Sequence, residues 1–451
     1  MSGSRQTFKA CCINNMKDNC PMIVGAVRFI RRLLSVPRAL YLALHEKHQM
    51  SVVQKRLDKK VAEIAKRKGT VKVGFLVIFD SAFQFEKLFS LMQSSKNFIP
   101  KIIIIPTINR PLKETERILN ATYEFYRRKY GDYVILSMER GTCLDFKDEY
   151  DLFITMNSYD GMTHGFYRIS YLSQAGKPVV TANYGYDGGT RYAESYTSMK
   201  HLGFLWRYYA GTKWLFDKLA KNQALLSKYS RIKLSGVPKM DGLSDVQMRT
   251  RSRKKIIICP HHSIPGSSLI TLSNFTRMHG LILKLPVMFP DIDWVFRPHP
   301  LLKQAMIDHA GWSERVWQEY ISDFTSYSNA IYYPEGDCFD LFVNSDAMIQ
   351  DCSSFLAEYH CSGHPQCYVL NDESTVVSQF DEWGQELLSH TYKAFSEDDV
   401  VQFVNEVVVK GEDIGASKRL HFVKEKMQLN FPHVNEVIFN DLKIAFNRLD
   451  S

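Results

Sequence analysis

The amino-acid sequence predicts an α/β protein in which two Rossmann-like domains, each a doubly wound parallel sheet, follow a helical extension. Short apolar segments alternate with helical patterns along residues 71–238 and again from residue 255 onward, and this alternation is typical of parallel sheets covered by helices. A length of 451 residues also exceeds a single ordinary core. The predicted parts are an extension at 1–68, an N-terminal domain at 69–238, a linker at 239–254, a C-terminal domain at 255–410 and C-terminal helices at 411–451.

The extension carries an amphipathic helical pattern over residues 21–45. Its apolar residues recur at helical spacing opposite Arg28, Arg31 and Arg32, and Pro37 is expected to break the helix into two pieces. Residues 1–68 hold fifteen Lys or Arg against four Asp or Glu, so the net charge of +9 belongs to this extension. The helix either lies in an anionic membrane surface, which we favour, or packs on the protein with a solvated basic face.

Composition argues against several other classes of protein. No run of about 18 uncharged apolar residues is present, and arginines interrupt the first apolar stretch, so we expect neither a membrane span nor a secretory signal. The body beyond the extension is close to neutral, and we expect no nucleic-acid partner. Nine cysteines without framework spacing indicate reduced thiols and the cytosol. Cys361 and Cys367, together with His360 and His364, suggest a zinc site. Because the sequence has no Cys-x-x-Cys knuckle there, we favour buried structural thiols over a zinc site.

The N-terminal domain is expected to begin with a buried strand at Val71–Phe79, followed by Asp80 and a helix through Leu91. The segment from Lys177 then predicts a strand that runs into a glycine-rich loop, Tyr184-Gly-Tyr-Asp-Gly-Gly189. Further strands are expected at 101–106, 133–136 and 151–155, a helix at 112–129, and a closing segment at 231–238.

Three predicted strands of the C-terminal domain end in polar groups. Residues 255–259 lead to His261 and His262, residues 294–296 lead to Arg297 and His299, and residues 346–349 lead to Asp351 and two serines. Two further strands are expected at 330–333 and 366–370. Because the carboxyl ends of parallel strands share one edge, where ligands bind, these groups are expected to form one phosphate site.

The segment from Asn344 to Pro365 predicts a strand, a tight polar turn and a helix. Ser353 and Ser354 are expected to be N-cap residues, and Gly363 followed by Pro365 ends the helix. Such a turn aims backbone N–H groups and the positive end of the helix dipole at one point, which suits a phosphate. A serine-capped helix without a ligand is the alternative for this segment alone.

These motifs resemble a known family. The pieces Phe296-Arg-Pro-His-Pro300, Tyr333-Pro-Glu-Gly-Asp-Cys-Phe-Asp-Leu341 and Ser345-Asp-Ala-Met-Ile-Gln-Asp-Cys-Ser-Ser354 are similar to those of the CDP-glycerol:poly(glycerophosphate) glycerophosphotransferases. Ser235-Gly-Val-Pro-Lys-Met-Asp241 is similar to that family's junction segment. The resemblance covers roughly residues 70–405 and implies a GT-B fold. His-Pro and Ser-Ser motifs also recur in capsule sialyltransferases and Kdo transferases.

The resemblance implies a donor site in the second domain and an acceptor site in the first. His299, Ser353 and Ser354 would grip the donor pyrophosphate, and the enzyme would be peripheral on the inner membrane face. We assign His261, His262, Arg297, Asp351 and Glu358 to the same donor site, and Asp80, His164, Tyr184 and Tyr186 to the acceptor side.

The chain departs from the family at the catalytic base. The family has a histidine in a His-Gly turn after a first-domain strand, where this sequence reads Tyr184-Gly-Tyr-Asp187. We expect Asp187 to accept the proton of the attacking hydroxyl, with Asp80 or His164 as alternatives. A turn aspartate without catalytic function is the other interpretation of Asp187.

The sequence therefore predicts a cytoplasmic, membrane-peripheral transferase. It would move glycerol phosphate or a related polyol phosphate from a CDP-linked donor to a hydroxyl of a lipid-linked glycan or polymer, with no cofactor and no metal. The alternatives are a GT-B glycosyltransferase that uses a nucleotide sugar and a non-catalytic membrane-bound scaffold.

Overall fold

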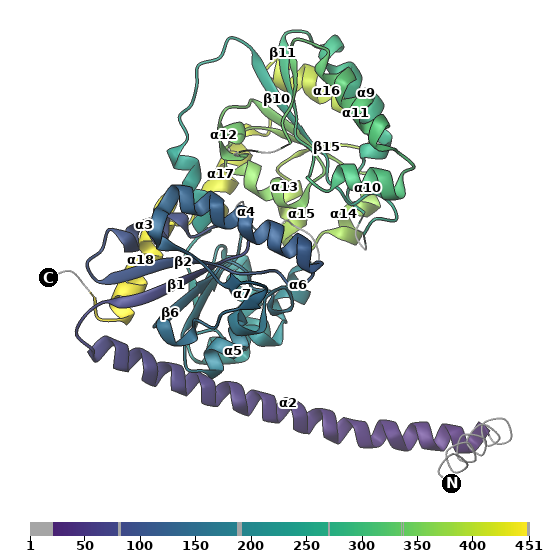
Figure 1. The fold of residues 1–451 in the computed structure, drawn as a ribbon. Coiled ribbons are helices and arrows are strands. Elements are labelled where there is room, and N and C mark those ends of the chain that lie inside the picture. Colours follow the sequence, from purple (N-terminus) through teal and green to yellow (C-terminus); the bar gives the residue numbers. More distant parts are fainter. Residues whose placement is uncertain are drawn as a thin grey trace. The chain divides into compact units, whose positions relative to one another are not determined.

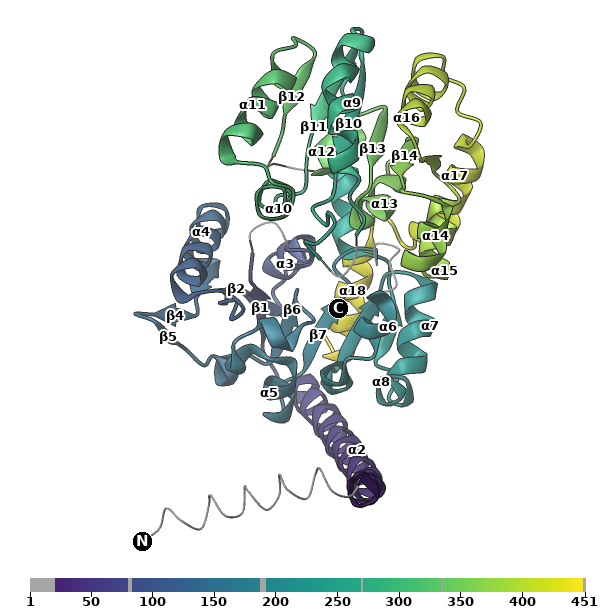
Figure 2. The ribbon, with the colours of Figure 1, turned by 90° about the vertical axis from the view of Figure 1, so that its right-hand side faces the viewer.

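The computed structural model describes residues 21–79, 83–186, 192–268, 271–334, 336 and 338–448, with the side chains of 21–43, 192 and 193 left out. Two parallel sheets, of seven and six strands, form the frame of the described chain, with helices packed around each (Figures 1 and 2). The predicted α/β class is confirmed. Three strands of these sheets were not predicted as strands from the sequence: Arg207–Ala210 (β8), Ile232–Leu234 (β9) and Tyr392–Ala394 (β15).

The first sheet has the strand order β3-β2-β1-β6-β7-β8-β9, all parallel. The chain builds one half outward from β1, then returns to build the other half from β6, so the order reverses between β1 and β6. The strands are Val71–Val77 (β1), Phe98–Ile104 (β2), Val134–Leu136 (β3), Leu152–Thr155 (β6), Val179–Ala182 (β7), Arg207–Ala210 (β8) and Ile232–Leu234 (β9); a separate hairpin pairs Met138–Glu139 (β4) with Thr142–Cys143 (β5).

The second sheet repeats this plan with the order β12-β11-β10-β13-β14-β15. Its order reverses between β10 and β13, which are paired neighbours. In open parallel sheets, ligands bind outside the carboxyl ends of the strands at such a reversal. The strands are Lys254–Cys259 (β10), Ile292–Phe296 (β11), Ala330–Tyr332 (β12), Ala347–Gln350 (β13), Gln366–Val369 (β14) and Tyr392–Ala394 (β15).

Helices connect the strands of both sheets. Around the first sheet they are Glu86–Gln93 (α3), Leu112–Tyr130 (α4), Ile169–Gln174 (α5), Tyr192–Thr197 (α6), Lys213–Asn222 (α7) and Ala224–Lys228 (α8), with short 3-10 turns at Gly131–Tyr133 (η2), Lys147–Glu149 (η3), Asp160–Met162 (η4), Gly165–Tyr167 (η5) and Lys200–Phe204 (η6). Around the second they are Phe275–Met288 (α9), Leu302–His309 (α10), Glu314–Thr325 (α11), Cys338–Val343 (α12), Ser353–His360 (α13), Glu373–Gln379 (α14), Glu382–Leu388 (α15), Glu397–Phe403 (α16) and Ala416–Phe422 (α17), with π-helical turns at Val404–Val409 (η8) and Val423–Met427 (η9).

The second sheet is buried on both faces, which explains its continuous apolar strands. Along β10, Ile256 and Ile258 belong to one hydrophobic cluster, with residues of α9, α10, α11 and α16. Ile257 and Cys259 point into the other cluster, with residues of α12, α13, α15 and α17. Alternate side chains of one strand thus hold helices on opposite faces, and the carboxyl end of β10 is fixed between them.

The junction between the sheets is the 3-10 helix η7 (Pro238–Asp245), which the C-terminal helix α18 (Val434–Ala445) holds in place. Asp241 accepts hydrogen bonds from the backbone N–H of Val434 at 3.2 Å and of Asn435 at 2.9 Å, so its carboxylate lies at the N-terminus of α18. The Asn435 side chain also donates to the carbonyl oxygen of Pro238 at 2.9 Å. Helix α18 packs on α3 as well, so the C-terminal segment lies against the first sheet's helices.

Helix α2 extends over Pro21–Lys66 without interruption, so the expected break at Pro37 is wrong. A proline inside a helix removes one N–H donor, and the helical backbone of α2 continues through this position. Two compact units, Met1–Arg56 and Leu57–Ser451, divide the chain within α2. Among the described residues, none of the helices is long and apolar enough to cross a membrane.

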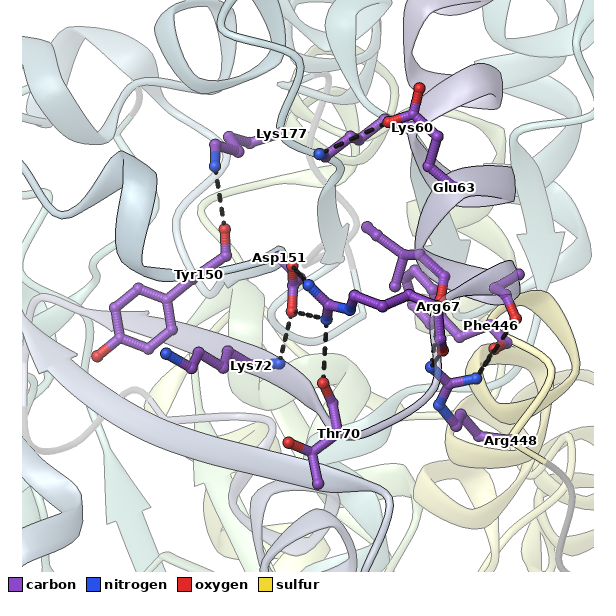
Figure 3. Close-up of polar contacts among 12 residues, drawn as sticks. Lys60, Glu63, Arg67, Thr70, Lys72, Tyr150, Asp151, Lys177, Phe446 and Arg448 are labelled. Atoms are coloured by element: carbon purple, nitrogen blue, oxygen red, sulfur yellow. Dashed lines mark hydrogen bonds and ion pairs between the residues drawn. The ribbon is translucent and has the colours of Figure 1, made fainter.

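Two arginines anchor the last turns of α2, which belong to the second unit (Figure 3). Arg67 donates to both carboxylate oxygens of Asp151, at 3.0 and 2.6 Å. Arg448 donates to the carbonyl oxygens of Ile64 and Arg67, at 3.2 and 2.6 Å. A guanidinium at this position satisfies carbonyl groups that a helix C-terminus leaves without partners and opposes its negative dipole end. The end of α2 is therefore held rigidly at the start of the first sheet.

Candidate functional site

A cavity of about 1050 Å³ lies beside the carboxyl end of the second sheet, with walls from both sheet domains and from η7. The second domain contributes Arg297, His299, Ser354 and Glu358, all of them predicted site residues. Tyr184 is the predicted acceptor-side residue that lines it. The structure thus brings five of the predicted side chains around one space.

His261, His262 and His299 form a cluster of three rings, in tilted and edge-to-face contact, at the ends of β10 and β11. Their ring centroids lie 4.2 Å apart for the first two, 4.1 Å for His262 and His299, and 5.1 Å for His261 and His299. His299 lines the cavity, and the rings of His261 and His262, which contact His299, are not part of the lining. The sequence expectation that these turns meet at one edge agrees with this geometry.

Backbone hydrogen bonds fix the proton positions of two of these rings. The N–H of Leu301 donates to Nδ1 of His299 at 3.1 Å, and the N–H of Ser263 donates to Nδ1 of His261 at 3.2 Å. A neutral imidazole that accepts at Nδ1 carries its proton on Nε2. Each of the two rings can therefore donate a hydrogen bond from Nε2.

All three rings are neutral near pH 7. Burial, with the neighbouring imidazoles, lowers the pKa of His261 to about 3 and that of His299 to about 4. Burial also lowers the pKa of His262. A cluster of neutral rings avoids the repulsion that protonated imidazoles would suffer at these distances.

A metal ion is the other ligand that this cluster suggests, because nitrogen atoms of the three rings lie within 4.8 Å of one another. A metal-ligating histidine, however, usually donates N–H from its second nitrogen to an acceptor. In His299 the Nδ1 atom instead accepts a backbone N–H, and Nδ1 of His261 contacts both the backbone N–H and the hydroxyl of Ser263. The arrangement therefore favours an anion that accepts hydrogen bonds. Cys361 and Cys367, the pair weighed for zinc, form no such cluster with histidines in the described chain.

Asp351 supports the histidine turn instead of lining the cavity. Its carboxylate accepts the backbone N–H of His261 and of Asn274, both at 2.6 Å, and the residue is 3% exposed. Burial raises the pKa of this carboxyl to about 7, although the backbone hydrogen bonds oppose the shift. Asp351 thus connects the end of β13 to the turn at His261 and to the segment at Asn274. It is a positioning residue of the site.

Helix α13 directs its N-terminus at the cavity, with Cys352, Ser354 and Phe355 on the lining. The N-cap residue is Cys352, without a side-chain capping bond, and Ser353 and Ser354 are the first two helical residues. The expectation that the serines cap the helix is therefore wrong, because the turn begins one residue earlier. The backbone N–H groups of the first turn need acceptors, and an anion supplies them.

Arg297 lies on the cavity wall, yet its guanidinium holds a loop. Nη1 donates to the carbonyl oxygen of Tyr333, and Nη2 to that of Gly336, both at 3.1 Å, with Cys338 Sγ also at 3.1 Å from Nη2. The guanidinium carbon is 5.4 Å from the centroid of the Tyr333 ring. These contacts show that Arg297 holds the loop, in addition to its predicted part in the donor site. The sequence could not reveal the contacts, because the partners lie 36–41 residues away.

Other predicted residues lie away from the cavity lining in the described part of the chain. Tyr186 is buried, and its hydroxyl donates to the carbonyl oxygen of Met427 at 2.7 Å. His164 begins the 3-10 turn η5 and accepts the N–H of Phe166 at Nδ1. Asp80 and Asp187 lie outside the described residues. Of the three proposed bases, Asp80 and Asp187 are thus not placed by the structure, and His164 does not line the cavity.

Sequence reasoning assigned several charged residues of the cavity wall to no site, and Lys239 is one of them. Lys239, at the start of η7, donates to both carboxylate oxygens of Glu358, at 2.9 and 3.1 Å. Its Nζ also lies 4.5 Å from the centroid of the Tyr184 ring. The signal that could have found Lys239 is its position in the junction segment, directly after Pro238.

Solved structures that are similar to this chain include a polymerase and two epimerases. The wall teichoic acid polymerase TagF has a TM-score of 0.51 at 12% identity, covering 90% of this chain and 97% of that one. A UDP-N-acetylglucosamine 2-epimerase has a TM-score of 0.53 at 14% identity, covering 85% and 98%. The UDP-GlcNAc 2-epimerase from Neisseria meningitidis, bound to UDP-GlcNAc, has a TM-score of 0.52 at 12% identity, covering 82% and 99%. No known protein family and no curated protein sequence matches the chain.

These similarities settle the fold. The chain has a GT-B-like fold of two parallel-sheet domains, as the resemblance implied. At such low identities the likeness concerns the fold alone, and it extends to a polymerase and to epimerases alike. The choice among chemistries must therefore come from the cavity and its side chains.

Proposed function

We propose that this protein is a transferase that moves glycerol phosphate, or a related polyol phosphate, from a CDP-linked donor to a hydroxyl of a membrane-linked glycan or polymer. The observation that carries the proposal is the convergence of the histidine cluster and the α13 N-terminus on one cavity. Both present N–H donors without requiring a metal ion. A diphosphate fits these donors because its oxygens are strong acceptors.

In the proposed reaction, the acceptor hydroxyl oxygen attacks the β-phosphorus of the donor. The bond between that phosphorus and the bridging oxygen breaks, and CMP leaves with the bridging oxygen. His299 and the backbone N–H groups of α13 stabilise the charge that grows on the diphosphate. The hydroxyl proton passes to a base, for which Asp187 is our first candidate, with Asp80 and His164 as alternatives.

The donor is tested by offering the purified protein CDP-glycerol, UDP-sugars and CMP-sugars, each with a membrane fraction as the acceptor source. We expect CMP to be released from CDP-glycerol or another CDP-polyol and the polyol phosphate to enter the acceptor. Release of CMP from CMP-sugars alone would overturn the proposal. Full activity of an Asp187→Ala variant would remove the base assignment and leave the donor assignment intact.

A glycosyltransferase that uses a nucleotide sugar is the second candidate. The similar epimerase fold with bound UDP-GlcNAc is the observation that favours it, because the nucleotide there is linked to a sugar. The same cavity would bind the diphosphate, and the acceptor would attack an anomeric carbon instead of phosphorus. Incorporation of a sugar, together with release of a nucleoside diphosphate, distinguishes the two reactions.

We also propose that the enzyme is cytoplasmic and peripheral on the membrane, with the basic extension in contact with anionic lipid. Support comes from the charge excess within residues 1–68 and from the anchoring of the last turns of α2 by Arg67 and Arg448. Deletion of residues 1–50 should weaken binding to anionic vesicles, and added salt should weaken binding of the full chain. Unchanged binding after the deletion would contradict this placement.

A further inference from the structure

A buried ion pair on the cavity wall has no part in the proposed chemistry so far. Lys239 and Glu358 come from the junction helix η7 and from α13, with side chains 21% and 2% exposed. Burial alone would lower the pKa of Lys239, but the Glu358 carboxylate and the Tyr184 hydroxyl more than reverse this, and the pKa is raised. The ammonium is therefore charged throughout the physiological range.

The backbone that carries Lys239 is held firmly. Pro238, one residue earlier, accepts a hydrogen bond from the Asn435 side chain, and Asp241, two residues later, binds the N-terminus of α18. Lys87 donates to the carbonyl oxygen of Asp241 at 2.7 Å, which ties the same segment to α3. The side chain then passes between two rings, with Nζ 4.5 Å from the Tyr184 centroid and 5.7 Å from that of Phe339. Such support is what a precisely placed binding group needs.

The other cationic side chains on the wall have different partners. Arg297 donates to two carbonyl oxygens, and Lys87 pairs with Asp245 at 2.8 Å. Arg249 pairs with Asp340 at 2.6 Å and has a side chain that is 65% exposed. Lys239 alone among these four combines a buried carboxylate partner with two aromatic faces. In such a place an ammonium meets an anion with little competition from water.

A buried ion pair is a weak source of stability, because removing two charges from water offsets most of their attraction. Its position on the wall of a cavity points to a ligand. We propose that Lys239 binds the β-phosphate of the nucleotide donor, and that Glu358 positions its ammonium for this contact. The inference rests on the proposed function and adds to it a charge contact from the junction between the domains.

The test compares CDP with CMP, because the two nucleotides differ only in the β-phosphate. Calorimetric titration of a Lys239→Met variant should show CDP affinity reduced by about 10- to 100-fold, the range for one charge-assisted hydrogen bond. CMP affinity should change by less than about threefold. Lys239→Arg should recover part of the CDP affinity, because it restores the charge with a different shape.

A matched control is Lys177→Met. Lys177 is also shielded, with a side chain 13% exposed, and donates to the carbonyl oxygen of Tyr150 (Figure 3). It is absent from the lining of the cavity, so its removal should leave both affinities unchanged.

Three results would overturn the inference. Equal losses of CDP and CMP affinity in Lys239→Met would show a structural residue. If the wild type binds CDP and the Lys239→Met variant binds both CDP and CMP with unchanged affinity, Lys239 does not belong to the site, and the proposed function still stands. A wild type that binds neither nucleotide would refute the proposed function and the inference together.

Discussion

The two sides of the cavity differ in how their side chains are held. On the second domain, His261 and His299 are fixed by backbone N–H groups, and Asp351 ties the turn to β13. On the first domain, the described wall is rich in aromatic rings, from Phe83, Phe125, Tyr126 and Tyr184. One wall presents directed hydrogen-bond donors, and the other presents broad apolar faces.

This difference separates two tasks. A diphosphate requires donors at fixed distances, and backbone hydrogen bonds provide such fixed positions. The glycan or polyol acceptor of the proposed reaction would have weakly polar C–H faces, for which aromatic rings are suitable partners. We therefore expect substitutions on the two walls to affect donor and acceptor separately.

The largest effect is expected for His299→Ala. Loss of one hydrogen bond to a charged phosphate oxygen should reduce CDP affinity by about 10- to 100-fold, measured by calorimetry. His309→Ala is the matched control, because His309 is exposed at the end of α10. Unchanged CDP binding in His299→Ala would remove the histidine cluster from the donor site.

A smaller effect, on stability, is expected for Asp351→Asn. The pKa of the Asp351 carboxyl is raised from its usual 3.8 to about 7 in the folded state, so the folded protein binds more protons than the unfolded chain between these values. The carboxyl therefore stabilises the fold most below about pH 4, and this contribution is lost as pH rises toward 7. The Asn variant should lose that part of the pH dependence.

Urea unfolding at pH 5 and at pH 8 measures this difference. The fall in the free energy of unfolding between the two pH values should be larger in the wild type than in Asp351→Asn. Asp308→Asn, an exposed carboxyl on α10, should behave as the wild type does. An equal fall in all three proteins would show that Asp351 is not the titrating group.

Much of the fold followed from the sequence because apolar runs and turn residues are local signals. The expected strands at 71–79, 255–259 and 366–370 correspond to β1, β10 and β14. Strand β8 (Arg207–Ala210) was missed because its aromatic residues next to basic ones resemble a surface segment. Strand β15 was missed because three residues, Tyr392–Ala394, are too short to show a period.

The sequence predicted those residues of the candidate site that directly follow a strand. His261, His262 and His299 were expected at one edge, and the structure brings them together. Contacts between residues far apart in the sequence could not be predicted. Lys239 and Glu358 lie 119 residues apart in sequence, and no local pattern connects them. For the same reason, the sequence did not predict the contacts of Arg297 with the loop after β12.

On the aromatic wall, Phe125→Ala should have a smaller and separable effect. Phe125 is 44% exposed although it faces the cavity from α4, and exposed aromatic surface inside a cavity is suited to ligand contact. The acceptor KM should rise by about three- to tenfold, equivalent to roughly 1 kcal/mol of lost contact, with CDP affinity unchanged. A fall in CDP affinity with an unchanged acceptor KM would reverse the assignment of the two walls.

The smallest expected effect is a flat pH profile of CDP affinity between pH 5.5 and 7. An ordinary histidine gains its charge near pH 6.5, and a site that relied on imidazolium would bind phosphate more tightly at the acidic end. His299 and His261, with pKa values near 4 and 3, stay neutral over this range. Calorimetry should therefore find changes no larger than those expected from protonation of CDP itself. A steep gain in affinity toward pH 5.5 would mean that phosphate binds with uptake of a proton, and the donor wall would then act through charge instead of through fixed N–H groups.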